Sequence, residues 1–172
     1  AFQGEKGAYS HIACEEIYKG AEVKNCSTFE ETFKIAFEDE NFKAIIPLEN
    51  SLAGRVADIH YLLPKYKLQI YGEHFQNVEH CLLSKQEAAL KDIKYIRSHA
   101  QAIGQCQNII KKNNFKPIIS ADTAGSAKDL SEGKDKSVAA IASELAAKIY
   151  GLKILKKNIE DESGNVTRFL IM

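Results

Sequence analysis

The segment SVAAIASELAAKIYG, residues 137–151, carries the pattern that decides the fold class. SVAAI is a short apolar run typical of a buried strand. ASELAAKIYG follows it directly with the apolar spacing of a helix, which Gly151 is expected to end. A buried strand that leads directly into a helix is the basic unit of an α/β protein. The segment therefore predicts one strand–helix unit of an α/β fold.

The same alternation extends along the chain on both sides of this segment. The apolar runs FKAIIPL, IKYIRS and FKPIIS each precede a stretch with helical spacing. GNVTRFLIM, residues 164–172, is predicted to be a further strand. Pro47 is expected to end a strand, and a helix is expected to stop near Pro64. This alternation indicates mostly parallel sheet flanked by helices on both faces.

Composition excludes several classes of protein. The 172 residues include 23 basic and 23 acidic side chains, so the net charge is zero, which argues against a nucleic-acid-binding protein. No apolar run approaches the roughly 20 residues of a membrane helix. The start of the chain, AFQGEKGAYS, is no secretion signal, so a cytoplasmic location is expected. The four cysteines form no CxxC pair and the five histidines no HExxH pattern, so we infer no structural metal.

Polar residues follow the predicted strands, at the edge where α/β proteins bind ligands. The segments concerned are GEKGAYS (4–10), ENS (49–51), SHAQ (98–101) with Gln105 one turn further on, ADTAGSA (121–127) and GNVTRF (164–169). Each segment taken alone is more commonly a plain turn or a helix cap. Together they offer hydroxyls, amides, helix N-termini and one carboxylate. This set suits a small polar anion held by neutral donors.

The two faces of the last predicted strand carry different side chains. Successive residues of a strand point to opposite faces. Asn165, Thr167 and Phe169 therefore share one face, and Val166 and Arg168 share the other. Thr167 and Arg168 thus need not serve the same purpose.

Six motifs in order along the chain resemble those of prephenate dehydratase: GEKGAYS, IPLENSLAGRV, SHAQAIGQC, DTAGSA, AAIASELAAKIYG and NVTRFLI. The resemblance covers Ala1 to Met172 and extends to the closely related arogenate dehydratases. It implies two α/β lobes that resemble a type 2 periplasmic binding protein, with the active site in the interlobe cleft. Lobe 1 is expected at about 1–76 plus 156–172 and lobe 2 at about 77–155. The family's C-terminal ACT regulatory domain is expected to be absent. The chain is then either a catalytic domain taken from a longer protein, which is the interpretation that we favour, or a natural short form.

The resemblance also implies which residues form the site. The family's essential threonine lands on Thr167, and its ENS glutamate lands on Glu49; these two are the expected catalytic residues. The expected substrate-binding residues are Ala8, Tyr9, Ser10, Asn50, Ser51, Ser98, His99, Gln101, Gln105, Thr123, Asn165 and Arg168. Arg168 has an alternative role, in which it braces its strand from the other face.

The implied reaction removes CO2 and water from prephenate to give phenylpyruvate, in phenylalanine biosynthesis. Because aromatisation drives this reaction, no metal or redox cofactor is expected. Thr167 would donate a hydrogen bond to the departing oxygen, since a hydroxyl is too weak an acid to be the ultimate proton source. That source would be Glu49, if burial keeps its carboxyl protonated, or His99.

Several alternatives stay open at the level of sequence. The chain could be an arogenate dehydratase that gives phenylalanine directly, a two-lobe anion-binding module without chemistry, or a phenylalanine-sensing regulatory protein. A small-molecule substrate is expected, with no nucleic acid or membrane as partner. A homodimer or higher homo-oligomer is expected because dimers are common in the family.

Overall fold

A computed structural model describes residues 1–172, which divide into two compact units. The first unit comprises Ala1–Glu5, Tyr9–Val78 and Gly164–Met172, and the second comprises Lys6–Ala8 and Glu79–Ser163. The chain enters the second unit at Val78–Glu79, near the predicted boundary. It returns at Ser163–Gly164, later than predicted, because residues 156–163 stay with the second unit. There, the amide of Ile159 donates to the carbonyl of His80 over 3.0 Å.

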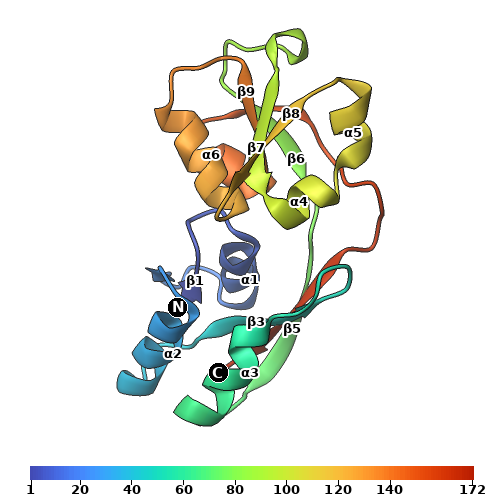
Figure 1. Cartoon of the computed structure of the whole chain (residues 1–172). Helices are drawn as coiled ribbons and strands as arrows, with labels where there is room; N and C mark the ends of the chain where they lie inside the picture. The colour runs from blue at the N-terminus through green and yellow to red at the C-terminus, as the bar shows by residue number, and fades with distance from the viewer. The chain divides into compact units, whose positions relative to one another are not determined.

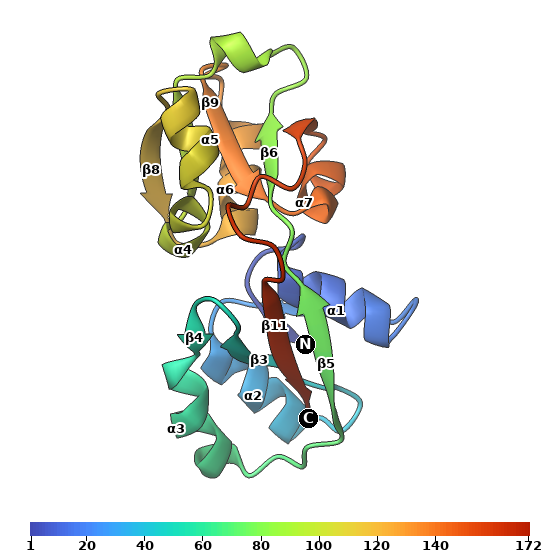
Figure 2. The same cartoon turned by 90° about the vertical axis from the view of Figure 1, so that its right-hand side faces the viewer.

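The sheet of the first unit has the strand order β2–β1–β3–β11–β5, and β4 pairs with β3. Figure 2 shows β11 lying between β3 and β5. β1 is parallel to β2 and β3, whereas β11 is antiparallel to both of its neighbours. The strands are β1 (Phe2–Gln3), β2 (Asn25–Cys26), β3 (Ile45–Asn50), β4 (Gly54–Arg55), β5 (Gly72–Asn77) and β11 (Val166–Ile171).

Helices cover both faces of this sheet. They are α1 (Tyr9–Ile17), α2 (Phe29–Glu38) and α3 (Ala57–Tyr66). Phe169 of β11 packs in the core on the α1 side, and Leu170 packs with Phe33 of α2 and Ile59 of α3 on the other side. The alternation of side chains along β11 thus contributes one core residue to each face.

The sheet of the second unit has the order β10–β6–β9–β7–β8. Figure 1 shows this sheet with α4, α5 and α6 around it. Its strands are β6 (Cys81–Ser84), β7 (Tyr95–His99), β8 (Lys116–Ser120), β9 (Val138–Ala142) and β10 (Lys153–Lys156). Its helices are the 3-10 turn η1 (Leu90–Asp92), α4 (Ala100–Gly104), α5 (Gln107–Lys112), α6 (Thr123–Glu132) and α7 (Glu144–Ile149). The segment 137–151 is confirmed as a strand–helix unit, β9 followed by α7.

The predicted two-part α/β architecture is confirmed, but the sheets are mixed rather than mostly parallel. In the second unit, β7 is parallel to β8 and β9, whereas β6 is antiparallel to β9 and β10. A parallel neighbour requires a long crossover connection within one sheet. The chain reaches β6 after it leaves the first unit, and it reaches β11 after it leaves the second. Neither strand therefore follows a crossover connection within its own sheet, and neither has to run parallel to its neighbours. The likeness to periplasmic binding proteins and the interlobe position of the substrate stay predictions.

Pro47 does not end its strand as predicted, whereas a helix does end near Pro64. Pro47 lies inside β3, where the pairing with β11 shifts between Arg168 and Phe169. Such a bulge tolerates a residue that cannot donate a backbone hydrogen bond. Pro64 lies inside α3, which ends at Tyr66 with Lys67 in the left-handed conformation. The proline removes one hydrogen bond within the last turn, and the helix ends near it, as predicted.

The stretch predicted as one helix after β7 forms two short helices. α4 ends at Gly104, and α5 begins at Gln107. The backbone at Gln105 and Cys106 turns between them, which leaves Gln105 as the C-cap of α4. No helix of the chain has the length and apolar character to cross a membrane.

Candidate active site

A row of three polar side chains crosses the sheet of the first unit, on the face that α1 covers. Thr167 of β11 is paired with Asn50 of β3 on one side and with Gln76 of β5 on the other. Asn50 Nδ2 donates to Thr167 Oγ1 over 2.9 Å and to Asn165 Oδ1 over 2.6 Å. Thr167, Asn165 and Gln76 are all buried. The Thr167 hydroxyl is thus held by its contact with Asn50, on a strand that is paired on both sides.

The turn after β3 fixes the orientation of the Asn50 amide. Asn50 Oδ1 accepts the backbone amides of Leu52 and Ala53 over 3.0 and 2.9 Å. With its oxygen engaged in this Asx-type turn, the amide can present only its nitrogen to Thr167. The predicted turn role and the predicted ligand role of Asn50 are thus compatible.

Ser51 ties the same turn to the start of β11. Its backbone amide donates to the carbonyl of Val166 over 2.8 Å, and its Oγ accepts the amide of Val166 over 2.9 Å. The same hydroxyl donates to the carbonyl of Gly164 over 3.2 Å. The Ser51 hydroxyl therefore has protein partners in both roles, and these contacts fix the entry into β11.

The Thr167 hydroxyl retains a donor. Its oxygen accepts from Asn50, and its hydrogen donates to no protein group. A hydroxyl can donate one hydrogen bond while it accepts others. Thr167 can therefore give a directed hydrogen bond to a ligand oxygen.

Glu49 lies on the opposite face of the sheet from Thr167. Its partner across the strands is Arg168, whose Nη1 is 3.0 Å from Glu49 Oε1. The Glu49 side chain is 50% exposed. The premise that the Glu49 side chain is buried is therefore wrong, because the register of β3 and β11 turns it towards a cation and solvent.

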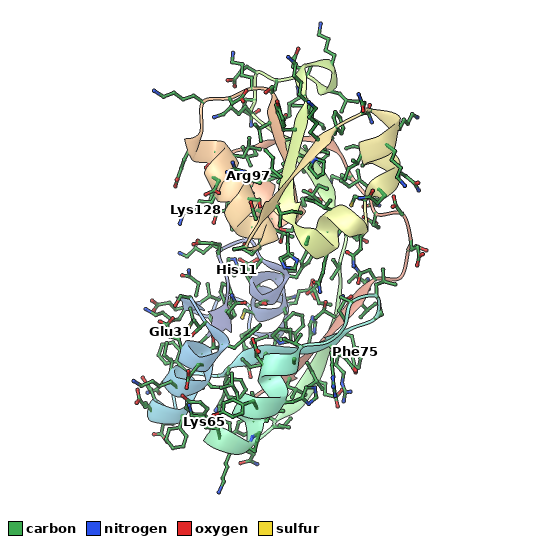
Figure 3. All side chains as sticks on the ribbon, in the orientation of Figure 1. His11, Glu31, Lys65, Phe75, Arg97 and Lys128 are labelled. Atoms are coloured by element: carbon green, nitrogen blue, oxygen red, sulfur yellow. The ribbon has the colours of Figure 1, made fainter.

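Arg168 bridges the two strands that flank β11. Its Nε and Nη2 bind the Glu73 carboxylate over 2.7 and 3.0 Å, while Nη1 binds Glu49. These contacts raise the pKa of Arg168, and the Arg168 guanidinium lowers the pKa of Glu73. Phe75 of β5 also points out from the sheet on this face and is 62% exposed (Figure 3). The contacts of Arg168 link β11 to both neighbouring strands, which is the bracing role given above as its alternative.

The motif GEKGAYS contributes to both units. Lys6–Ala8 belongs to the second unit, whereas Tyr9 and Ser10 begin α1 in the first. Gly7 has a φ of +91°, and a Cβ there would lie 2.7 Å from the Cα of Ala146. Ser143 Oγ donates to the carbonyl of Gly7 over 2.5 Å. Only glycine satisfies both the backbone angle and this close approach.

Several predicted residues of the second unit meet at one edge of its sheet. Ser98 and His99 end β7, and Thr123 follows the neighbouring parallel strand β8. The carboxyl ends of neighbouring parallel strands share an edge, as predicted. Ser98 is fully buried, and its hydroxyl donates to the carbonyl of Ile141 over 2.7 Å. Its hydroxyl proton therefore serves the link between β7 and β9.

The caps at this edge come from His99 and Asp122. His99 Nδ1 accepts the backbone amide of Gln101 over 3.3 Å, so the neutral ring carries its proton on Nε2. Asp122 rather than Thr123 caps α6, through the amide of Gly125. Gln101 is exposed on α4.

Gln105 is held by a residue that sequence reasoning did not select. Its Oε1 is 2.9 Å from Nε2 of His80, a buried histidine just before β6. Gln76 was missed in the same way. The candidate residues were those that follow predicted strands, whereas Gln76 lies within β5 and His80 precedes β6. A buried-strand position occupied by glutamine was the available signal for Gln76.

The family model of prephenate dehydratase matches residues 1–172. The chain belongs to the prephenate dehydratase family. It is 45% identical to a bifunctional N-acyl-homoserine lactone acylase/prephenate dehydratase of Komagataeibacter europaeus over 99% of this chain and 61% of that protein. It is 40% identical to arogenate dehydratase/prephenate dehydratase 2 of Arabidopsis thaliana over 100% of this chain and 45% of that protein.

A solved prephenate dehydratase structure has the same fold. The enzyme from Staphylococcus aureus superposes with a TM-score of 0.84 at 29% identity, over 99% of this chain and 64% of that one. The chain thus spans less than two thirds of the prephenate dehydratase family proteins compared with it.

Proposed function

We propose that the chain catalyses the decarboxylating dehydration of prephenate to phenylpyruvate, CO2 and water, as a carbon–oxygen lyase of phenylalanine biosynthesis. The observation that carries the proposal is the Thr167 hydroxyl, which is oriented by Asn50 and keeps its hydrogen available. The match of the family model over residues 1–172 supports the assignment of substrate.

The bond changes define what the site must supply. The bond between the ring carbon and the hydroxyl oxygen breaks, and its electron pair leaves with the oxygen. The bond to the ring carboxylate breaks as CO2 departs, and that electron pair enters the ring, which becomes aromatic. One proton converts the departing hydroxide into water. A positioned donor at that oxygen typically accelerates such a step by about 100- to 10,000-fold.

Thr167 acts as this donor in our proposal, and solvent supplies the net proton. Glu49 has no part in the proton transfer because it is paired with Arg168 on the other face. The role of His99 as a proton relay, through the proton on its Nε2, stays a prediction. Asn50 orients Thr167, and Gln105 binds a substrate carboxylate through neutral donors. Neutral donors hold the departing carboxylate without the strong pairing that would stabilise the ground state.

Arogenate is the closest alternative substrate, since it differs from prephenate only in an amino group that replaces the side-chain keto group. The test incubates the 172-residue chain with each substrate separately and measures phenylpyruvate and phenylalanine. Turnover of prephenate with a higher kcat/KM than arogenate is expected. Binding of both without any aromatic product would identify an anion-binding module instead.

A second activity is favoured by one observation, the 45% identity to a relative that is also an N-acyl-homoserine lactone acylase. A thiolate nucleophile for such hydrolysis is disfavoured here, because burial raises the pKa of Cys14 and of Cys81 to about 11. Assaying the release of homoserine lactone from an N-acyl-homoserine lactone tests this activity.

A cytoplasmic location and a homodimer or higher homo-oligomer also belong to our proposal, and size-exclusion chromatography tests the assembly.

A further inference from the structure

β5 is an edge strand that lacks the features by which the other sheet edges avoid pairing with another chain. The two sheets end in β2, β5, β8 and β10, and Figure 2 shows β5 at the open side of its sheet. β2 has two residues, β8 contains a lysine followed by a proline, and β10 begins and ends with lysine and carries a bulge. Such features block the addition of a further strand. β5 has six residues and contains neither lysine nor proline, so it is the edge best suited to accept one.

The backbone of β5 presents a regular set of hydrogen-bonding groups at this open edge. The amide of Val78 donates to the carbonyl of Asn165 over 2.8 Å, in the register that pairs β5 with β11. Successive residues of an antiparallel strand direct their backbone groups to opposite sides, so the even-numbered residues of β5 pair with β11. Glu73, Phe75 and Asn77 therefore direct their N–H and C=O groups away from the sheet.

The side chains along this edge are apolar, or have their charge neutralised. Phe75 is 62% exposed, and Ile70 and Tyr71, just before the strand, are 50% and 60% exposed. The Glu73 carboxylate accepts from Nε and Nη2 of Arg168 over 2.7 and 3.0 Å, so its charge is already paired within its own sheet. The proposed chemistry uses none of these side chains.

We propose that β5 pairs with β5 of a second copy of this chain, antiparallel about a two-fold axis at Phe75, so that the two sheets join into one. In this register Phe75 faces its own counterpart, and Glu73 faces Asn77 on either side of the axis. The three outward-facing residues then make about six hydrogen bonds between the copies, two for each facing pair. No like charges face each other, and an aromatic pair across two strands is stabilising.

Other registers fit the sequence of β5 less well. An axis at Glu73 would set two carboxylates against each other, and an axis at Asn77 would pair Phe75 with a position beyond the end of the strand. The carbonyl of Asn77 accepts from Gln76 Nε2 over 3.2 Å, but a carbonyl has two lone pairs and can accept a second hydrogen bond. The pairing gives a surface to the homodimer of our proposed function and rests on that assembly, not on the activity.

The first test measures the mass of the 172-residue chain in solution by sedimentation equilibrium over a range of protein concentrations. The wild-type chain should be a dimer. Phe75→Lys sets two like charges against each other at the axis, so the dissociation constant of the dimer should rise by about 30-fold or more. Tyr61→Lys is the matched control, because Tyr61 lies on α3 and is 71% exposed, and it should leave the dissociation constant unchanged.

The second test examines the register with Phe75→Cys. All four natural cysteines are buried, so the introduced thiol is the exposed one. Residues that face each other in such a hydrogen-bonded pair have Cα atoms about 5.5 Å apart, within the span of a disulfide. Mild oxidation should therefore link Phe75→Cys chains into covalent dimers that a reducing agent separates, whereas Tyr61→Cys chains should stay unlinked.

The outcomes separate this interface from the proposals on which it builds. A monomeric wild-type chain would overturn the interface together with the proposed assembly, and would leave the β5 edge to another occupant, such as a strand of a longer protein. A dimer that Phe75→Lys leaves intact, that Tyr61→Lys weakens equally, or that Phe75→Cys does not cross-link would overturn the interface alone. If Phe75→Lys does not fold, the cross-linking of Phe75→Cys decides. Turnover of prephenate enters neither measurement, so a chain without activity leaves both tests valid.

Discussion

At the scale of single residues, two neighbours in the sequence have separate tasks. Thr167 and Arg168 are adjacent, yet their side chains lie on opposite faces of β11. Thr167 is bound by Asn50, and Arg168 by Glu49 and Glu73. The ENS motif follows the same alternation, because Glu49 pairs with Arg168 and Asn50 pairs with Thr167. The Asn50–Thr167 pair serves the proposed chemistry, and the Glu49–Arg168 pair holds the strands together.

The position of Glu49 leads to a prediction about proton transfer. Glu49→Gln keeps the shape of the side chain but removes its charge. Since Glu49 faces away from Thr167, kcat should stay within about threefold of wild type, and the pH–rate profile should keep both limbs. Steady-state assays across the pH range check this.

His99→Asn is the matched variant for this prediction. Asparagine can still cap α4, so the fold should be retained. If His99 relays the proton, this variant should lose one limb of the pH–rate profile. Loss of a limb in Glu49→Gln instead would show that Glu49 reaches the substrate and that its ion pair with Arg168 opens during turnover.

At the scale of elements, β11 organises the first unit. It lies between β3 and β5, contributes Phe169 and Leu170 to the two cores, and carries the Arg168 brace to both neighbours. The proposed site therefore depends on a strand that its neighbours hold on both sides. A rigid strand is a better support for a directed hydroxyl than a loop.

The brace gives stability a defined pH dependence. Arg168 holds the pKa of Glu73 below its ordinary value of 4.5 in the folded state. The ion pair therefore stabilises the fold above about pH 4.5, and this contribution is lost as the pH falls through the lower folded-state pKa. Glu73→Gln should lower the unfolding temperature at pH 7, and the difference from wild type should shrink towards pH 3.

Thermal unfolding at several pH values checks this prediction. Glu132→Gln, at the exposed end of α6, is the control and should show no such trend. A difference between Glu73→Gln and wild type that stays constant down to pH 3 would mean that Glu73 contributes through packing rather than through its charge.

The order of elements could be predicted from the sequence, but their pairing could not. Apolar runs and helical spacing predicted β9, α7 and most other elements because those patterns are local. The direction of β11 depends on β3 and β5, which lie about 90 to 120 residues earlier in the chain. The passage of β3 through Pro47 depends on a bulge in its pairing with β11. Neither feature is encoded within a window of neighbouring residues.

At the scale of the whole molecule, the predicted site residues fall into two sets. Asn50, Ser51, Asn165 and Thr167 meet in the first unit, and Ser98, His99 and Thr123 meet at one sheet edge in the second. Motifs predicted these positions because each follows or begins a strand. The contact between His80 and Gln105 was not predictable, since His80 lies in no motif and the two residues are 25 positions apart in the sequence.

The side chains of both sets are mostly neutral hydroxyls and amides. Hydroxyls and amides can orient an anion while leaving a departing carboxylate weakly paired. One such hydroxyl, on Thr167, is proposed to assist departure of the ring oxygen of prephenate.

The kinetics of Thr167→Val with prephenate test this claim most directly. Valine is nearly isosteric with threonine and favours a strand, so the unfolding temperature should change little, and Thr167→Ser should recover part of the rate. We predict that kcat falls about 100-fold or more, about 3 kcal/mol, with little change in KM. A folded Thr167→Val chain with near-normal kcat would contradict the claim, whether or not its KM had risen.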